Sequence, residues 1–117
     1  MFSVNFYQEE DGSKPVDEFI RSLDAKKQAK VVSDLNRLEM LGNEARMPLS
    51  KFLEDGIFEL RTKIDGNIIR ILYFFDKDKI IIATNGFVKK QQKTPRSEIL
   101  LAKQRRSSYH ERKENEK

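Results

Sequence analysis

The sequence contains no cysteine and a single histidine among its 117 residues. The absence of cysteine excludes disulfide bonds, thiolate zinc sites, iron–sulfur clusters and cysteine nucleophiles. Long apolar runs are also missing, because the longest, within 68–75 and 80–83, fall far short of the roughly 18 residues that predict a membrane-spanning helix. The N-terminal residues lack the basic and apolar stretches of a signal peptide. We therefore expect a soluble, cytoplasmic protein.

Charge is distributed unevenly along the chain. Residues 1–56 carry 8 Lys/Arg and 11 Asp/Glu, whereas residues 57–117 carry 15 Lys/Arg and 8 Asp/Glu. The formal net charge of +4 therefore arises entirely from the C-terminal half. A positively charged C-terminal half is typical of a protein that binds a polyanion such as nucleic acid. A basic surface that only contacts solvent is equally consistent with the composition.

The first 42 residues predict one strand and two helices. Residues 2–7 alternate between apolar and polar, which is typical of a half-buried strand. A short helix capped by Ser13 is expected next, followed by a longer helix over 25–41 that begins after Asp24 and ends at Gly42. The apolar stripe of the longer helix, with spacings of three and four, consists of Val31, Val32, Leu35, Leu38 and Leu41.

The second half of the chain predicts strands and one further helix. Residues 43–55 are expected to form a connection, and the last helix to begin with Thr94 as its cap. A flexible charged tail is expected at 113–117. The predicted strands cover 57–64, 68–75 and 79–89.

These elements predict a single α+β domain over residues 1–112 with the order β-α-α-β-β-β-α. The three late strands are expected to form an antiparallel sheet. The two N-terminal helices should pack on one face of this sheet, and a C-terminal helix should complete the domain.

The alternation within the strands gathers charged residues on one face of the predicted sheet. Arg70 is the only charged residue inside an apolar strand, where an unpaired charge is costly, so we expect it on an open face beside Arg61. Cations interleaved with aromatic rings suit an unstacked RNA strand. Alternatively, Arg61 pairs with Glu59 or Asp65, and the aromatic rings belong to the core. The face collects Arg61, Lys63, Arg70, Lys89 and Glu59, with Phe74 and Phe87 as stacking rings.

Three spaced segments of the chain resemble a known family when they are taken in order. They are Phe58-Glu59-Leu60-Arg61, then Gly66-Asn67 with Arg70-Ile71-Leu72-Tyr73-Phe74, and then Gly86-Phe87-Val88-Lys89-Lys90-Gln91-Gln92-Lys93-Thr94-Pro95. With Glu98-Ile99 and Ala102 after them, these segments are similar to the phage-derived HigB-like branch of the RelE/ParE toxins. The resemblance covers essentially the whole chain.

The resemblance implies a RelE-like fold and the toxin of a type II toxin–antitoxin system. Such a toxin is a ribosome-dependent mRNA interferase, an endoribonuclease that inhibits translation and arrests growth. The mRNA 2′-hydroxyl attacks the adjacent phosphate, with neither metal nor cofactor. The implied partners are a helix-turn-helix antitoxin (HigA-like), the ribosome and mRNA, with operator DNA contacted only through the antitoxin complex.

The resemblance also implies roles for particular residues. Arg61 and Arg70 match the family's basic residues on the middle strands, where arginine can bind a phosphate whose charge grows in the transition state. Lys89 or Lys90 matches the basic position that ends the last strand, and Lys93 is expected to contact RNA.

The proton acceptor is left open by the sequence. Residues 97–100 contain no tyrosine, and the single histidine, His110, lies late in the last helix and is expected to be a solvated bystander. The candidates are Glu59, Tyr73 and a lysine whose pKa is lowered by neighbouring cations.

Two other classes of protein are consistent with the same residues. A ParE-like gyrase inhibitor would keep the scaffold without cleaving RNA, because a fold does not determine a function. A non-catalytic module that binds nucleic acid or protein would require only the basic half of the chain.

Overall fold

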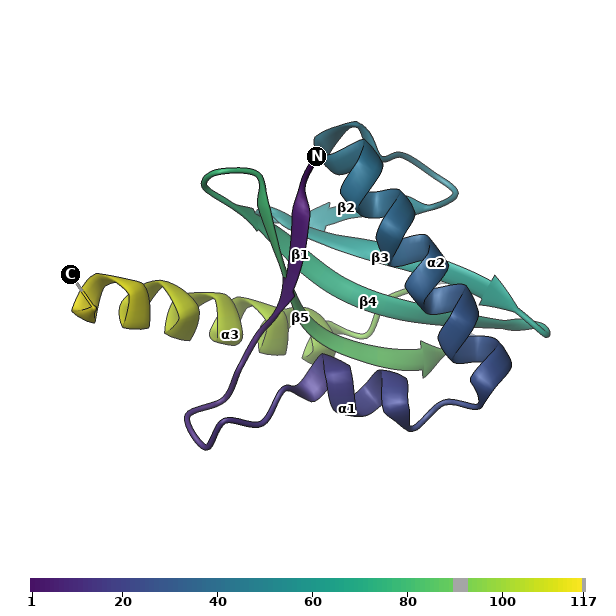
Figure 1. The fold of residues 1–117 in the computed structure, drawn as a ribbon, viewed down its shortest axis with the longest axis horizontal. Coiled ribbons are helices and arrows are strands. Elements are labelled where there is room, and N and C mark those ends of the chain that lie inside the picture. The colour runs from purple at the N-terminus through teal and green to yellow at the C-terminus, as the bar shows by residue number, and fades with distance from the viewer. Residues whose placement is uncertain (90–92, 117) are drawn as a thin grey trace.

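Figure 1 shows the computed structural model of the protein, which describes residues 1–89 and 93–116. Over these residues the fold is mixed α+β, with a five-stranded sheet and three α-helices, so the predicted α+β class is confirmed, whereas the predicted order of elements lacks one strand. The elements are β1 (Ser3–Phe6), α1 (Pro15–Arg21), α2 (Ala25–Leu41), the short 3₁₀ helix η1 (Gly42–Glu44), β2 (Ser50–Glu54), β3 (Ile57–Ile64), β4 (Asn67–Asp76), β5 (Ile80–Lys89) and α3 (Arg96–Asn115).

The sheet has the strand order β1-β5-β4-β3-β2. Strands β3, β4 and β5 form the antiparallel meander that the sequence predicts. β1 lies at one edge and pairs with β5 in parallel, whereas β2 lies at the other edge and is antiparallel to β3. No helix among the described residues is long and apolar enough to cross a membrane.

The helices cover both faces of the sheet (Figure 1). Helices α1 and α2 pack on one face, as predicted, against a cluster that includes Leu60, Ile71 and Ile81. Helix α3 packs on the opposite face, where Ala102 meets Phe74 and other apolar side chains of the central strands. The two hydrophobic clusters therefore lie on either side of a sheet that is buried at its centre.

The connection predicted over residues 43–55 is wrong in part, because Ser50–Glu54 forms strand β2. The strand pairs with β3 alone and its register shifts between Phe52 and Glu54. Phe52 is 56% exposed although it is apolar, and Leu53 beside it packs on the core. The other strands were predicted from the alternation of apolar and polar residues. An edge strand with this bulge lacks a regular alternation, so the sequence pattern did not indicate it.

The predicted helix ends are partly correct. Asp24 caps α2 by accepting a hydrogen bond from the Lys27 amide at 3.0 Å, and Gly42 ends the helix at a φ of 55°. Ser13 does not cap α1, since Lys14 occupies the N-cap position without a side-chain bond. Along α2, Val31, Leu35 and Leu38 are buried as predicted, whereas Val32 and Leu41 are 47% and 40% exposed.

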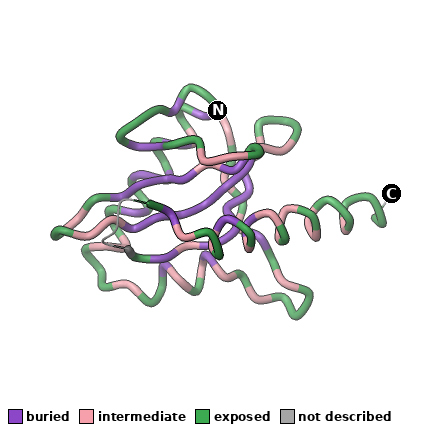
Figure 2. The backbone as a smooth tube through the Cα atoms, turned by 180° about the vertical axis from the view of Figure 1, so that it is seen from behind, coloured by how far each residue is buried: buried purple, intermediate pink, exposed green. Residues whose placement is uncertain are grey.

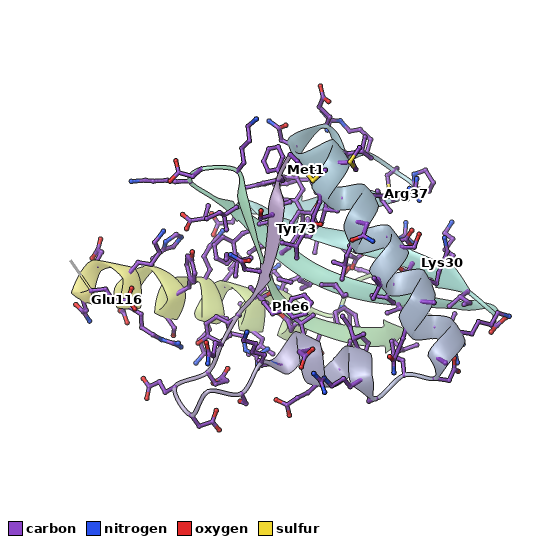
Figure 3. All side chains as sticks on the ribbon, in the orientation of Figure 1. Met1, Phe6, Lys30, Arg37, Tyr73 and Glu116 are labelled. Atoms are coloured by element: carbon purple, nitrogen blue, oxygen red, sulfur yellow. The ribbon has the colours of Figure 1, made fainter. Side chains whose placement is uncertain are left out.

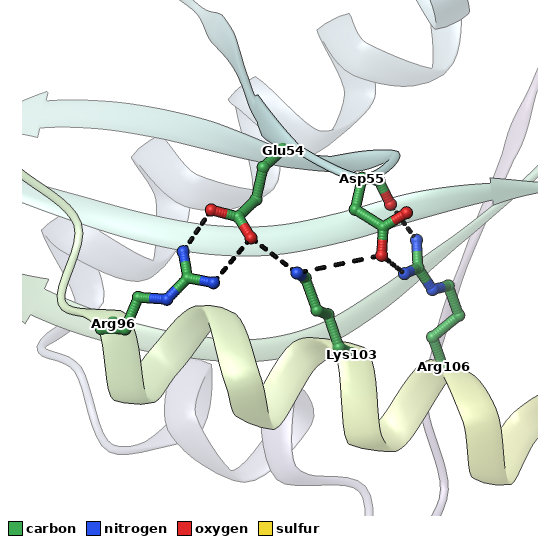
Figure 4. Close-up of polar contacts among 5 residues, drawn as sticks. All are labelled: Glu54, Asp55, Arg96, Lys103 and Arg106. Carbon is green, nitrogen blue, oxygen red and sulfur yellow. Dashed lines mark hydrogen bonds and ion pairs between the residues drawn. The ribbon is translucent and has the colours of Figure 1, made fainter.

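Helix α3 is joined to the ends of the strands by ion pairs as well as by apolar packing. Ile99 and Ala102 are its only buried residues. Glu54, at the end of β2, accepts hydrogen bonds from Arg96 Nη2 at 2.8 Å and from Lys103 Nζ at 2.6 Å (Figure 4). Asp55 accepts a bond from Arg106 Nη2 at 2.8 Å in the same view.

The far end of α3 is anchored in the same way. Asp76, in the last position of β4, accepts hydrogen bonds from Lys113 Nζ at 2.8 Å and from the Tyr109 hydroxyl at 2.7 Å. The helix continues to Asn115 and so includes most of the segment predicted as a flexible tail.

Because of these contacts, the stability of the folded protein should depend on pH in the acid range. Hydrogen bonds from Arg96 and Lys103 lower the pKa of Glu54 to about 2. Burial raises the pKa of Asp76, but hydrogen bonds from Lys113 and Tyr109 outweigh it and bring the pKa to about 2. Because both values lie below those of the unfolded chain, near 4, the stabilisation is complete above about pH 5 and is lost as the pH falls towards 2.

We therefore expect the urea concentration at the midpoint of unfolding to decrease as the pH is lowered from 5 to 2. This decrease should be smaller in the Glu54→Gln variant. Glu10→Gln is the control, since it makes the same change at an exposed carboxylate far from α3 in sequence. Identical pH profiles for wild type and Glu54→Gln would show that this ion pair does not stabilise the docking of α3.

Candidate functional site

The register between β3 and β4 brings the candidate catalytic arginines together. Arg61 lies directly opposite Arg70, and Glu59 precedes Arg61 on the same side of β3. The Glu59 carboxylate bridges the pair, with Oε1 at 3.5 Å from Arg61 Nε and Oε2 at 3.5 Å from Arg70 Nη1. One carboxylate therefore partly neutralises two guanidinium groups that the pairing of the strands forces side by side.

Thr94 completes this arrangement from a distant part of the chain. Its hydroxyl donates a short hydrogen bond to Glu59 Oε2 and accepts one from Arg70 Nη1 at 3.3 Å. The sequence predicted Thr94 as the cap of the last helix, which is wrong, because Pro95 occupies the N-cap position and the Thr94 side chain points into the sheet. We call Glu59, Arg61, Arg70 and Thr94 the buried charge cluster.

The expectation that these side chains project from an open face is wrong. Arg70, Glu59 and Arg61 are 0%, 1% and 8% exposed. Alternation along β3 and β4 correctly put them on one face, but α3 and the segments beside it cover much of that face. Figure 2, which views the molecule from behind, shows the central strands as buried.

The aromatic rings predicted to stack with RNA belong to the core. Phe74 is 2% exposed and makes an edge contact with Tyr109 of α3 at 5.6 Å between ring centroids. Phe87 lies on the same face as Arg70, as predicted, and opposite it in the register, but it is only 9% exposed. The prediction of stacking rings is therefore wrong, because α3 occupies the surface on which bases would stack.

Tyr73 is also misplaced as a candidate proton acceptor. Its side chain lies on the face covered by α1 and α2, packed in the first hydrophobic cluster, and its hydroxyl makes a short hydrogen bond with Ser50. Burial raises the pKa of Tyr73 to about 12. The sheet therefore separates this hydroxyl from the buried charge cluster.

Four lysines were also predicted to belong to the site, and the structure describes three of them. Lys63 is exposed near the end of β3. Lys89 ends β5 opposite Ile68 in the register. Lys90 lies outside the described residues. Lys93 is exposed just before Thr94.

A surface pocket adjoins the buried charge cluster. It has a volume of about 700 Å³ and lies between β2 and the start of α3. We call it the Lys51–Lys93 pocket after its two exposed lysines. Thr94 also lines it, so the residue whose hydroxyl bonds to Glu59 and Arg70 is part of the pocket wall. The complete lining is Lys51, Phe52, Leu53, Glu54, Lys93, Thr94, Pro95, Arg96 and Ile99.

Comparison with known families identifies this chain. Residues 18–107 match the family described as phage derived protein Gp49-like (DUF891). The chain belongs to this family. Gp49-like proteins are associated with the toxins of toxin–antitoxin systems. No curated protein matches the chain.

The Gp49-like match includes every residue of the buried charge cluster and every residue of the Lys51–Lys93 pocket. Sequence reasoning did not find Lys51 or the contacts of Thr94. The signal for Thr94 was its place in the Lys93-Thr94-Pro95 segment, and no pattern signalled Lys51, since β2 was not predicted. In residues 1–89 and 93–116 of the Gp49-like chain, no group of three His, Cys, Asp or Glu side chains is placed to hold a metal ion.

Proposed function

We propose that this Gp49-like protein is the RelE-like toxin of a type II toxin–antitoxin system, of the HigB-like branch, and that it cleaves mRNA on the ribosome. The observation that carries the proposal is the Lys51–Lys93 pocket, in which Thr94 connects a basic surface to a buried carboxylate and arginine. Family membership and the basic C-terminal half support the same conclusion.

In the proposed reaction, Lys51 and Lys93 hold the RNA backbone in the pocket. The mRNA 2′-oxygen attacks the adjacent phosphorus, its proton passes through the Thr94 hydroxyl to Glu59, and the bond from phosphorus to the 5′-oxygen breaks. The products are a 2′,3′-cyclic phosphate and a 5′-hydroxyl, whose proton comes from Lys89 or Lys90.

The sequence suggested that Arg61 and Arg70 bind the phosphate directly from an open face. In this proposal they act from buried positions instead. Arg70 is fully buried and bonded to both Glu59 and Thr94, so it is a positioning residue. Its charge, with that of Arg61, still stabilises the negative charge that develops on the phosphate. Most of the acceleration then comes from charge stabilisation and from positioning on the ribosome.

Incubating the purified protein with translating ribosomes tests this proposal. We expect new mRNA 5′ ends in the coding sequence, and we expect them to persist when zinc and transition metals are chelated at constant magnesium. Lys93→Ala should slow cleavage by about 10-fold or more, because it removes a charged hydrogen bond to the RNA backbone worth about 1.5–3 kcal/mol. Lys77→Ala, which removes an exposed lysine from the β4–β5 turn, is the control. An absence of cuts would overturn the proposal, and gyrase-dependent DNA breaks in their place would identify a ParE-like inhibitor.

One observation favours a second candidate, a non-catalytic nucleic-acid-binding protein. Glu59 and Arg70 are 1% and 0% exposed, which suits a structural ion pair as well as a reactive site. This candidate predicts RNA binding that weakens steeply with salt but is not accompanied by cleavage.

The proposed partners follow from the same assignment. They are a helix-turn-helix antitoxin, the ribosome and its mRNA, in the cytoplasm, with operator DNA reached only through the antitoxin. Support for a protein partner comes from α2, where Val32, Met40 and Leu41 are 47%, 69% and 40% exposed. In this proposal the antitoxin covers these exposed apolar side chains.

A further inference from the structure

A second basic pocket lies at the edge of the sheet between α2 and β3. It has a volume of about 130 Å³, and we call it the edge pocket. It is separate from the Lys51–Lys93 pocket and shares no lining residue with it. Four of its seven lining residues are cations. The lining is Lys30, Asp34, Arg37, Pro48, Leu49, Arg61 and Lys63.

Arg61 reaches this pocket from the buried charge cluster. Strand β2 begins at Ser50, and just before it the Leu49 carbonyl accepts a hydrogen bond from the Arg61 amide at 2.8 Å. Beyond Arg61, strand β3 has no β2 residue beside it and forms the edge of the sheet. On one side the Arg61 guanidinium lies 3.5 Å from Glu59, and on the other its Nη1 donates to the Met47 sulfur at 3.6 Å. The Arg61 side chain therefore links the cluster to the edge pocket.

The Arg61 guanidinium has hydrogen-bonding capacity that the protein does not fill. Its side chain is only 7% exposed, and its buried Nε has no hydrogen-bond partner. The acceptor for Nη1 is a thioether, which is a weak acceptor, and Met47 itself is 54% exposed. Buried polar groups in folded proteins are nearly always bonded, so a guanidinium that lines a pocket with its donors only partly used is a candidate to bind an anion.

Helix α2 contributes Lys30 and Arg37, which form the wall of the edge pocket opposite β3 (Figure 3). Asp34 is buried, with a side chain 3% exposed, and its Oδ1 lies 3.5 Å from Lys30 Nζ and 3.3 Å from Arg37 Nη1. Its Oδ2 accepts a hydrogen bond from the Thr62 hydroxyl at 2.8 Å. Both carboxylate oxygens are thus engaged, while the Lys30 and Arg37 side chains remain 44% and 57% exposed. The lining keeps a net positive charge that is available to an anion.

We propose that the edge pocket binds a phosphate of the RNA backbone, one that flanks the phosphate to be cut. RNA as the ligand rests on the proposed function, whereas the anion site rests on the lining of the pocket. Arginine and lysine donors that converge from two elements suit the oxygens of a phosphate, which accept several charged hydrogen bonds at once. Arg61 lines the edge pocket and pairs with Glu59, which bonds to Thr94 of the Lys51–Lys93 pocket. An RNA strand that follows these residues passes from the Lys51–Lys93 pocket around the end of β3.

The test uses two probes and a double variant, Lys30→Gln with Arg37→Gln. Inorganic phosphate, titrated against the wild-type protein, should shift the NMR signal of the Arg61 Nε–H group, and the double variant should lose this shift. Binding of a short single-stranded RNA with 2′-O-methyl groups, which is not cleavable, should weaken about 10-fold. The slope of log K against log salt should fall by about 0.7, as for one lost phosphate contact.

Two controls keep the result specific. Lys14→Gln with Lys77→Gln removes the same charge from exposed lysines elsewhere and should leave RNA binding and its salt slope nearly unchanged. Lys63→Gln, which does not touch Asp34, should weaken RNA binding even if the double variant is less stable in a thermal melt.

Three outcomes would overturn the inference. They are RNA affinity in the Lys30/Arg37 variant equal to wild type, an equal loss in the Lys14/Lys77 control, and a pocket that takes inorganic phosphate without contributing to RNA binding. Failure of the proposed cleavage is distinguishable, because RNA binding that depends on the edge pocket without any cuts on the ribosome would support this site and reject the nuclease.

Discussion

Replacing Arg70 by methionine should destabilise the protein by about 3–5 kcal/mol, the usual cost of removing one partner from a buried ion pair. Arg70 is fully buried, and it bonds to Glu59 and to Thr94. The substitution leaves the Glu59 carboxylate buried with a single neighbouring guanidinium. Urea unfolding followed by circular dichroism measures the loss, and growth arrest on expression should disappear with it.

A second substitution separates the charge from the packing. Adding Glu59→Gln to Arg70→Met removes the uncompensated carboxylate, so the double variant should regain part of the lost stability, with a coupling of about 0.5–3 kcal/mol. Growth arrest should stay absent, because Glu59 is the proposed proton acceptor. Strictly additive losses in the double-mutant cycle would show that the two side chains do not interact as their 3.5 Å separation indicates.

Replacing Leu38 by alanine should lower the free energy of unfolding by about 2–5 kcal/mol, through the cavity that it leaves between α2 and the sheet. Leu38 is 1% exposed and belongs to the cluster beneath α1 and α2. Any loss of activity should then follow the fraction of unfolded protein at the assay temperature, because Leu38 lies outside the buried charge cluster and both pockets.

Met40→Ala is the matched control for this change, since Met40 lies on the same helix and is 69% exposed. Its effect should stay within about 0.5 kcal/mol, as for most surface substitutions. A Leu38→Ala protein as stable as Met40→Ala would mean that α2 presents a different side to the sheet.

The sequence predicted which residues share a face, because alternation in a strand depends only on the chain itself. Glu59, Arg61 and Arg70 lie together for this reason, and the stripe through Val31, Leu35 and Leu38 is buried as expected. These patterns have a fixed geometric period, so they can be interpreted without knowing the rest of the structure.

The sequence did not predict what covers each face. Alternation placed Arg70 and Phe74 on one side of β4, but their burial depends on where α3 packs, and α3 is held by ion pairs that reach the turns of distant strands. Thr94 shows the same limit. Its position before Pro95 suggested a local cap, whereas a buried carboxylate on β3, far away in sequence, is its actual partner.

The pairing of β1 with β5 has a consequence for the order of events during synthesis. Ser3 is aligned with Ile80, so the first strand to be made finds its neighbour in the sheet only when the last strand has been made. Until α3 follows, the side chains of Leu72, Phe74 and Phe87 lack their cover. Contacts between such distant segments slow folding and delay it until most of the chain is present. The nascent chain thus carries Arg61 and Arg70 before β1 has paired with β5 and before α3 covers their face of the sheet.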